Sequence, residues 1–186
     1  MKSKDSRLRK LLLTTIGVAV IAAALSGCGG PATFSTPTYP FSFEYPSGWT
    51  TSRNAAFVYG AGSGERSVAV AYKAPNDQVV VTQYKLQKTL PKGIVANQKE
   101  VDRIVSKLTK QAGGTASDAR VVKYGGLPGY QYIIEYQQGG VPLRNTLTFL
   151  FGGDDEFQIN CQSSEKNREE IQKGCDQVLS TLKFTN

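Results

Sequence analysis

Residues 119–161 read ARVVKYGGLPGYQYIIEYQQGGVPLRNTLTFLFGGDDEFQINC, and this stretch decides the fold class. Four segments in it are rich in aromatic and aliphatic side chains, over residues 119–124, 130–136, 143–151 and 156–161. The runs GGLPG, QQGGVP and GGDD separate these segments, as turns separate consecutive strands of an antiparallel sheet. Because no helical pattern lies between the strands, the sheet is expected to be largely antiparallel.

The flanking sequence adds further strands and two helices. Strand patterns cover residues 41–45, 55–59, 67–73 and 79–85, and the Gly-rich run 60–64 fits a hairpin and no phosphate-binding motif. A first helix is expected from the N-cap Asn97 to Gly113–Gly114, and a second over residues 164–183. Each has one apolar stripe that can cover a sheet, so the class is α+β.

The N-terminus has the pattern of an export signal. Five basic residues lie within the first ten, and the next fifteen carry no charge. This apolar segment is short for a membrane span, and it runs into Leu25-Ser26-Gly27-Cys28, a lipobox. We expect residues 1–27 to be a lipoprotein signal peptide and Cys28 to carry the lipid. The alternative is a weak membrane-spanning anchor with an ordinary Cys28.

The mature chain would then have two parts. Residues 28–40 contain Gly, Pro, Ser and Thr but no charge, which predicts a lipidated flexible tether. Residues 41–186 form the folded domain. The expected location is the extracytoplasmic face of the cell membrane, with the lipid as anchor; Gly29 argues against an aspartate-type inner-membrane retention signal in a host with two membranes.

Composition restricts the function. The precursor has a net charge of +7, but 17 basic and 14 acidic residues remain after residues 1–27 are removed, so no nucleic-acid partner is expected. The chain has no histidine, which removes Ser-His and Cys-His catalysis and imidazole metal ligands. We therefore expect no enzyme activity, no metal site and no cofactor.

The remaining candidate residues each have an ordinary interpretation. Asp154, Asp155 and Glu156 are expected at a solvated hairpin tip, with weak Ca²⁺ binding as the alternative. Glu135 alternates with apolar neighbours and is expected on the solvent side of its strand, a buried general acid being the alternative. Nine tyrosines serve core packing or, with arginines, a partner-binding face.

Two further cysteines are expected to meet at one interface. Cys161 lies on the apolar face of its strand, and Cys175 lies on the apolar stripe of the last helix. An exported compartment favours a disulfide between them. Two buried free thiols and a redox thiol are the alternatives.

The order of these elements resembles the PsbP-like family, that is, proteins similar to the PsbP C-terminal domain. The resemblance covers about residues 40–184 and rests on FSFEYPSGW at residues 41–49, the middle helix, LPGYQYIIEY at 127–136, and FQINC followed by a helix and VLSTLKF. It implies an α-β-α sandwich around an antiparallel sheet. The best-known members are extrinsic subunits on the luminal face of photosystem II, and cyanobacterial relatives are lipoproteins.

The resemblance implies docking without catalysis. The expected function is a docking, assembly or accessory module on a membrane protein complex, which would be photosystem II in a photosynthetic host. A carrier of a small ligand or metal ion, held between sheet and helix, is the alternative from a different class.

Overall fold

The computed structural model describes residues 30–54, 66–86 and 98–185. The strands are β1 Ala32–Phe34, β2 Phe41–Tyr45, β3 Thr50–Arg53, β4 Arg66–Lys73, β5 Asp77–Lys85, β6 Thr115–Ala116, β7 Arg120–Tyr124, β8 Leu127–Gln138, β9 Val141–Gly152, β10 Asp155–Ser164 and β11 Lys183–Phe184. The helices are α1 Gln98–Gln111, the short 3₁₀ helix η2 Glu165–Asn167 and α2 Arg168–Thr181. The strand expected at 55–59, the run 60–64 and Asn97 lie outside the described residues.

The larger sheet has eight strands in the order β3-β4-β5-β10-β9-β8-β6, and β7 also pairs with β8. All its strand pairs are antiparallel. Its centre is the continuous run β8-β9-β10, in which apolar residues alternate with polar ones because successive side chains of a strand point to opposite faces. The expected antiparallel α+β architecture is confirmed.

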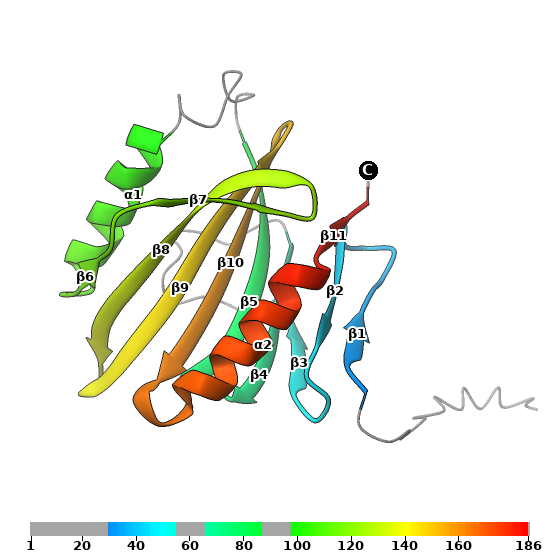
Figure 1. Cartoon of the computed structure of the whole chain (residues 1–186), viewed down its shortest axis with the longest axis horizontal. Coiled ribbons are helices and arrows are strands. Elements are labelled where there is room, and N and C mark those ends of the chain that lie inside the picture. The colour runs from blue at the N-terminus through cyan, green and yellow to red at the C-terminus, as the bar shows by residue number, and fades with distance from the viewer. Residues whose placement is uncertain (1–29, 55–65, 87–97, 186) are drawn as a thin grey trace, which may run out of the picture.

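Helices α1 and α2 cover opposite faces of this sheet (Figure 1). On β10, Ile159 and Cys161 belong to the core beneath α2, whereas Asn160 between them points to the other face. On β8, Tyr130 and Tyr132 belong to the core beneath α1. The molecule therefore has three layers, helix, sheet and helix, as the α-β-α sandwich requires.

The stretch expected to be a tether, residues 28–40, is folded from Ala32 onward, so that prediction is wrong for most of its length. Strand β1 pairs with β2 in a small sheet ordered β1-β2-β11, beside α2 in Figure 1. Phe34 and Tyr39 are 7% and 8% exposed and belong to the core beneath α2. The ring of Phe34 stacks on Phe43 at a centroid distance of 5.3 Å. The folded domain thus begins at Ala32 rather than Phe41, because two aromatic side chains outweigh the surrounding turn-forming residues.

Three other short strands depart from expectation. Strand β3 has four exposed residues, TTSR, and therefore shows no apolar alternation. Strands β6 and β11 have two residues each, too few for any periodic pattern. The last helix also begins later than expected, at Arg168 after the 3₁₀ turn, and ends at Thr181.

Candidate functional site

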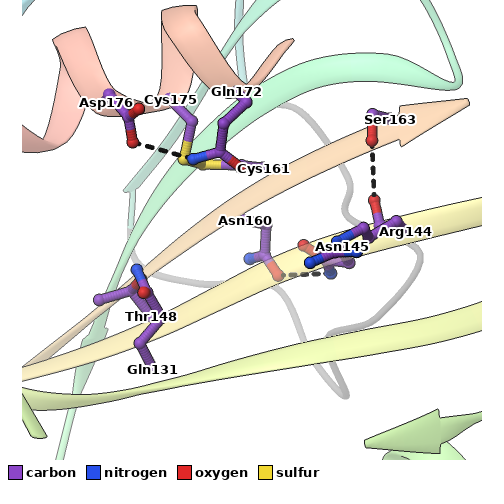
Figure 2. The surroundings of a disulfide bond; sticks show 10 residues. All are labelled: Gln131, Arg144, Asn145, Thr148, Asn160, Cys161, Ser163, Gln172, Cys175 and Asp176. Atoms are coloured by element: carbon purple, nitrogen blue, oxygen red, sulfur yellow. Dashed lines mark hydrogen bonds between the residues drawn. A yellow bond between two sulfur atoms is a disulfide. The ribbon is translucent and has the colours of Figure 1, made fainter. Parts of the chain in front are cut away.

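The two later cysteines form a disulfide. The Sγ atoms of Cys161 on β10 and Cys175 on α2 are bonded, and both residues are buried (Figure 2). The bond joins the central sheet to the helix that covers it, as expected from the two apolar faces. The lipid-attachment residue Cys28 lies outside the described residues.

A pair of asparagines lies on the sheet face opposite the disulfide (Figure 2). Asn145 Nδ2 donates a hydrogen bond of 3.3 Å to Asn160 Oδ1, and the two residues are 0% and 1% exposed. Within the described residues, Asn145 Oδ1 and Asn160 Nδ2 have no hydrogen-bond partner. One free acceptor beside one free donor is suited to a single buried water molecule.

The acidic residues 154–156 form more contacts with the rest of the protein than a solvated hairpin tip would. Asp155 accepts hydrogen bonds from Gln83 Nε2 at 2.6 Å and from Lys85 Nζ. Glu156 is half-buried and accepts from Gln158 Nε2 at 2.7 Å. Burial raises the pKa of Glu156, although this hydrogen bond opposes the rise. Asp154 alone of the three is exposed, so the expectation of a solvated tip is wrong for Asp155 and Glu156.

Glu135 lies where the sequence placed it. Its side chain is 56% exposed and forms a 3.4 Å ion pair with Arg144 on the neighbouring strand β9. An exposed pair of this kind contributes little to stability. The solvent-side interpretation is confirmed, and the buried general acid is excluded.

Most tyrosines serve the core. The buried members are Tyr39, Tyr130, Tyr132 and Tyr136. Tyr72 is the exposed one among the described tyrosines, at 39%. Its ring lies 5.7 Å from Trp49, and Lys73 Nζ lies 5.0 Å from the Tyr72 ring centroid. The interpretation as core packing therefore holds for these four tyrosines. Among the described tyrosines, Tyr72 is the candidate for contact with a partner.

An open cavity of about 560 Å³ lies between α1 and the edge of the sheet formed by β6 and β8. Along α1, Gln98, Asp102, Val105 and Thr109 line it. These positions are three or four residues apart and therefore share one face of the helix. On the facing side the wall is formed by Tyr132 and by residues 114–119. A volume of this size suits a small organic ligand.

Strand β6 forms part of the wall of this cavity because the chain turns tightly after α1. Gly113 has a φ of 66°, in the left-handed region that favours glycine at helix C-termini. A Cβ atom on Gly114 would lie 2.8 Å from the Cβ of Tyr136, so only glycine allows this close approach to β8. The paired glycines thus end the helix and place the wall of the cavity.

A hydrogen bond joins the two walls of the cavity. The Tyr132 hydroxyl donates to Asp102 Oδ1 at 2.7 Å. Burial, this hydrogen bond and the negative charge of Asp102 raise the pKa of Tyr132 above its ordinary value, and burial and Asp102 likewise raise that of Tyr130. Tyr132 therefore remains a neutral donor that orients the carboxylate.

One residue that lines the cavity, Thr109, has a hydroxyl oxygen that is inaccessible to solvent. Thr109 is 5% exposed, and its Oγ1 has no hydrogen-bond partner within the described residues. Sequence reasoning missed Asp102 and Thr109, since it assigned the buried face of the helix from its apolar residues. The spacing of Gln98, Asp102 and Thr109 was the signal that could have found them, because residues four and seven apart lie on one face of a helix.

The cavity has the chemistry of a binding site. Within the described residues, no group of three or more His, Cys, Asp or Glu side chains could hold a metal ion. Its carboxylate, hydroxyl and amide groups can accept and donate hydrogen bonds to a polar ligand.

Comparison with known proteins finds likeness in structure alone. No protein family model matches the chain, and no curated protein sequence matches it. Cyanobacterial PsbP (CyanoP) from Synechocystis sp. PCC 6803 superposes with a TM-score of 0.58 at 16% identity, over 89% of this chain and 98% of that one. This chain has a PsbP-like fold.

A second solved structure shares the PsbP-like architecture. LpqN of Mycobacterium tuberculosis, described as involved in cell envelope biogenesis, matches with a TM-score of 0.50 at 11% identity. The match covers 87% of this chain and 88% of LpqN. At these identities the likeness concerns the fold.

Within the described residues, no helix is both long and apolar enough to cross a bilayer.

Proposed function

We propose that this protein is a lipid-anchored, extracytoplasmic docking or assembly module that binds a membrane protein complex without catalysing a reaction. The observation that carries the proposal is the PsbP-like fold, which matches cyanobacterial PsbP over nearly the whole of both chains. In a photosynthetic host, the partner complex would be photosystem II.

Location outside the cytoplasm is supported by three features. The basic N-terminus, the apolar segment and the lipobox at Cys28 occur in the order of a lipoprotein signal. The Cys161–Cys175 disulfide is typical of proteins in oxidising compartments. LpqN, which shares the fold, is described as involved in cell envelope biogenesis.

A role without catalysis is supported by residue types. The chain has no histidine, and its buried carboxylate Asp77 accepts hydrogen bonds from Ser164 and Asn167. Asp155 is occupied by Gln83 and Lys85. These carboxylates hold the fold together, which leaves them poorly placed to transfer protons to a substrate.

We place the docking contact at Tyr72. The ring is 39% exposed and contacts Trp49 and Lys73, and these contacts limit the conformational freedom that it would lose when a partner covers it. Trp49 itself packs against Gly174 of α2, where an added Cβ would clash with the indole ring. A tyrosine fixed in this way is a typical energetic centre of an interface.

In-cell crosslinking tests this proposal. The protein, carrying a C-terminal tag, is crosslinked in its host, extracted in detergent and purified, and the captured proteins are identified by mass spectrometry. We expect one membrane protein in near-stoichiometric yield, and a yield several-fold lower for Tyr72→Ser. Val121→Ser is the matched control, because Val121 on β7 is a more exposed apolar residue, at 63%. Recovery of the lipoprotein alone would contradict docking.

A second candidate function, that of a carrier of a small ligand, is favoured by the cavity beside α1. It lies between helix and sheet, on the far side of the sheet from α2. Native mass spectrometry of the protein after incubation with host extract would detect a bound small molecule as added mass, and an unchanged mass would leave this function without support.

A further inference from the structure

We propose that the end of the domain at which β1 begins lies directly against the lipid bilayer and holds Tyr72 at the level of the headgroups. This end, called the anchor end below, comprises the start of β1 and the β2–β3, β4–β5 and β8–β9 turns. The proposal rests on the lipid anchor of the proposed function. Lipidation and orientation are read from separate measurements on one preparation, so their failures can be told apart.

The link between Cys28 and the fold is too short to hold the domain clear of the membrane. Strand β1 begins at Ala32, four residues after Cys28. Four residues of fully extended chain span at most about 14 Å. A lipid on Cys28 places that residue at the inner boundary of the headgroup layer, which is about 5–8 Å thick. Ala32 therefore lies within about 10 Å of the outer surface of the headgroups.

The strand register shows which residues lie beside Ala32. Ala32 pairs with Tyr45 at the end of β2, and β3 begins after the next turn. The start of β3 pairs with the C-terminal part of β4, next to Tyr72. Trp49 and Tyr72 therefore lie at the anchor end, with their ring centroids 5.7 Å apart. In Figure 1 the start of β1, the β2–β3 turn and the β8–β9 turn all lie at the lower side.

Exposed apolar side chains support contact between this end and lipid. The large apolar residues that are exposed within the described part of the chain are Tyr72 (39%), Val141 (37%) and Val121 (63%). Val141 begins β9, and the register across β9, β10, β5 and β4 places it at the same end of the sheet as Tyr72. Val121 lies towards the other end, opposite Tyr130 near the start of β8. Tyrosine and tryptophan are enriched at membrane–water interfaces, and Lys73 beside Tyr72 can extend its ammonium group to the headgroups.

The charges at the anchor end nearly balance. Lys73, Lys166 and Arg168 are exposed there. Glu165 and Glu169 are exposed beside them. A strong attraction to anionic lipid is therefore not expected, and the short link and the apolar side chains should hold the orientation at high salt as well as at low salt.

This orientation also specifies the part of a partner that Tyr72 can meet. A ring at the level of the headgroups faces the residues of a membrane protein that adjoin its membrane spans. Docking at Tyr72 would therefore involve the juxtamembrane part of the partner complex and not a domain far from the bilayer.

The fluorescence of Trp49 tests the orientation, because Trp49 is the only tryptophan in the chain. The protein is extracted from host membranes in detergent and reconstituted into phosphatidylcholine vesicles in which part of the lipid carries a nitroxide on its headgroup. We expect about twofold quenching of Trp49 relative to vesicles without the nitroxide, since the indole ring would lie close to the headgroups. The quenching should be the same at high salt.

Two variants make the result specific to the short link and to the anchor end. An insertion of about twelve Gly and Ser residues between Gly29 and Gly30 leaves the lipobox and β1 intact and adds a reach of about 20 Å, so it should remove most of the quenching. Trp49→Phe combined with Val121→Trp moves the tryptophan to the far end of the sheet, where we expect little quenching. The insertion variant keeps Trp49 in the core, so it decides the question if Trp49→Phe lowers stability.

The intact mass of the same preparation separates the two possible failures. An unmodified Cys28 would refute the lipid anchor and, with it, this orientation. A lipidated protein whose Trp49 is not quenched, or is quenched equally after the insertion, would overturn the orientation and leave the anchor standing. Equal quenching of tryptophan at positions 49 and 121 would overturn it too, by showing that neither end of the sheet faces the bilayer preferentially.

Discussion

Asp77 is a buried carboxylate that organises the start of the C-terminal helical segment. It is 4% exposed, and it accepts hydrogen bonds from the Ser164 backbone N–H at 2.7 Å, the Ser164 hydroxyl at 2.8 Å and Asn167 Nδ2 at 2.8 Å. An anion at a helix N-terminus is further favoured by the helix dipole. Asp77 thereby connects β5 to the junction between β10 and α2.

Replacement of Asp77 should therefore be costly. Asp77→Ala leaves three donors without their acceptor, and we expect the free energy of unfolding in urea to fall by about 3 kcal/mol. Asp176→Ala, at an exposed position of α2, is the control and should change it by less than about 0.5 kcal/mol. Equal effects of the two substitutions would show that the Asp77 contacts do not stabilise the fold.

Glu156 should make stability depend on pH. Its pKa is raised chiefly by burial, so the folded state favours the neutral carboxyl. The resulting stabilisation is present below the pKa of the unfolded chain, about 4.3, and is lost as the pH rises through the folded-state pKa. Glu156→Gln should therefore raise the free energy of unfolding at neutral pH and leave it nearly unchanged at about pH 3.5. Urea unfolding at both pH values measures this, and a destabilised variant at neutral pH would refute it.

The residues of the candidate site show where prediction from sequence ends. The apolar residues of α1 were correctly assigned to the sheet side, and Val101 and Val105 are buried there. Thr109 and Asp102 were missed because a polar residue in an amphipathic pattern is normally on the solvent side. Their burial arises from β6, a two-residue strand that packs beside the helix and carries no sequence pattern of its own.

At the scale of elements, the disulfide fastens α2 to the sheet. Its cysteines are 14 residues apart, and the chain-entropy model gives such a closed loop a stabilisation of about 3 kcal/mol. Cys161→Ala with Cys175→Ala should lose at least this amount in urea unfolding. Reduced wild-type protein is the control, since it keeps both sulfur atoms in the core and isolates the effect of the bond. Reduced and oxidised protein of equal stability would contradict the prediction.

Strand β1 should behave as part of the fold and not as a tether. Phe34→Ala removes a buried ring that contacts Tyr39 and Phe43, and we expect a loss of about 3–5 kcal/mol. Thr33→Ala on the same strand, at an exposed position, should have little effect. Thermal unfolding of the two variants measures the difference, and a Phe34→Ala protein as stable as wild type would restore the tether interpretation.

The elements that could be predicted were those with long periodic patterns. Strands β8, β9 and β10 and both long helices were placed within a few residues, because each has enough turns or alternations to show its period. Strand β1 was hidden by the Pro, Ser and Thr residues around its one buried side chain, Phe34. Strand β3 was hidden because none of its four side chains is buried.

For the whole molecule, the three-layer arrangement separates two kinds of surface. The face beneath α2 is closed by that helix, the small sheet and the disulfide, and Tyr72 lies near its margin against Trp49. The other face carries α1 and its open cavity. A partner complex at Tyr72 would therefore leave the cavity accessible, so docking and ligand binding are compatible in one protein.

Intact-mass spectrometry tests whether the protein acts from a lipid anchor outside the cytoplasm. The protein is extracted from host membranes in detergent and purified through a C-terminal tag. We expect a chain that begins at Cys28, lacks residues 1–27 and carries the added mass of a diacylglyceryl group, with or without a further acyl chain. A chain that still begins at Met1, or one with an unmodified Cys28, would contradict it.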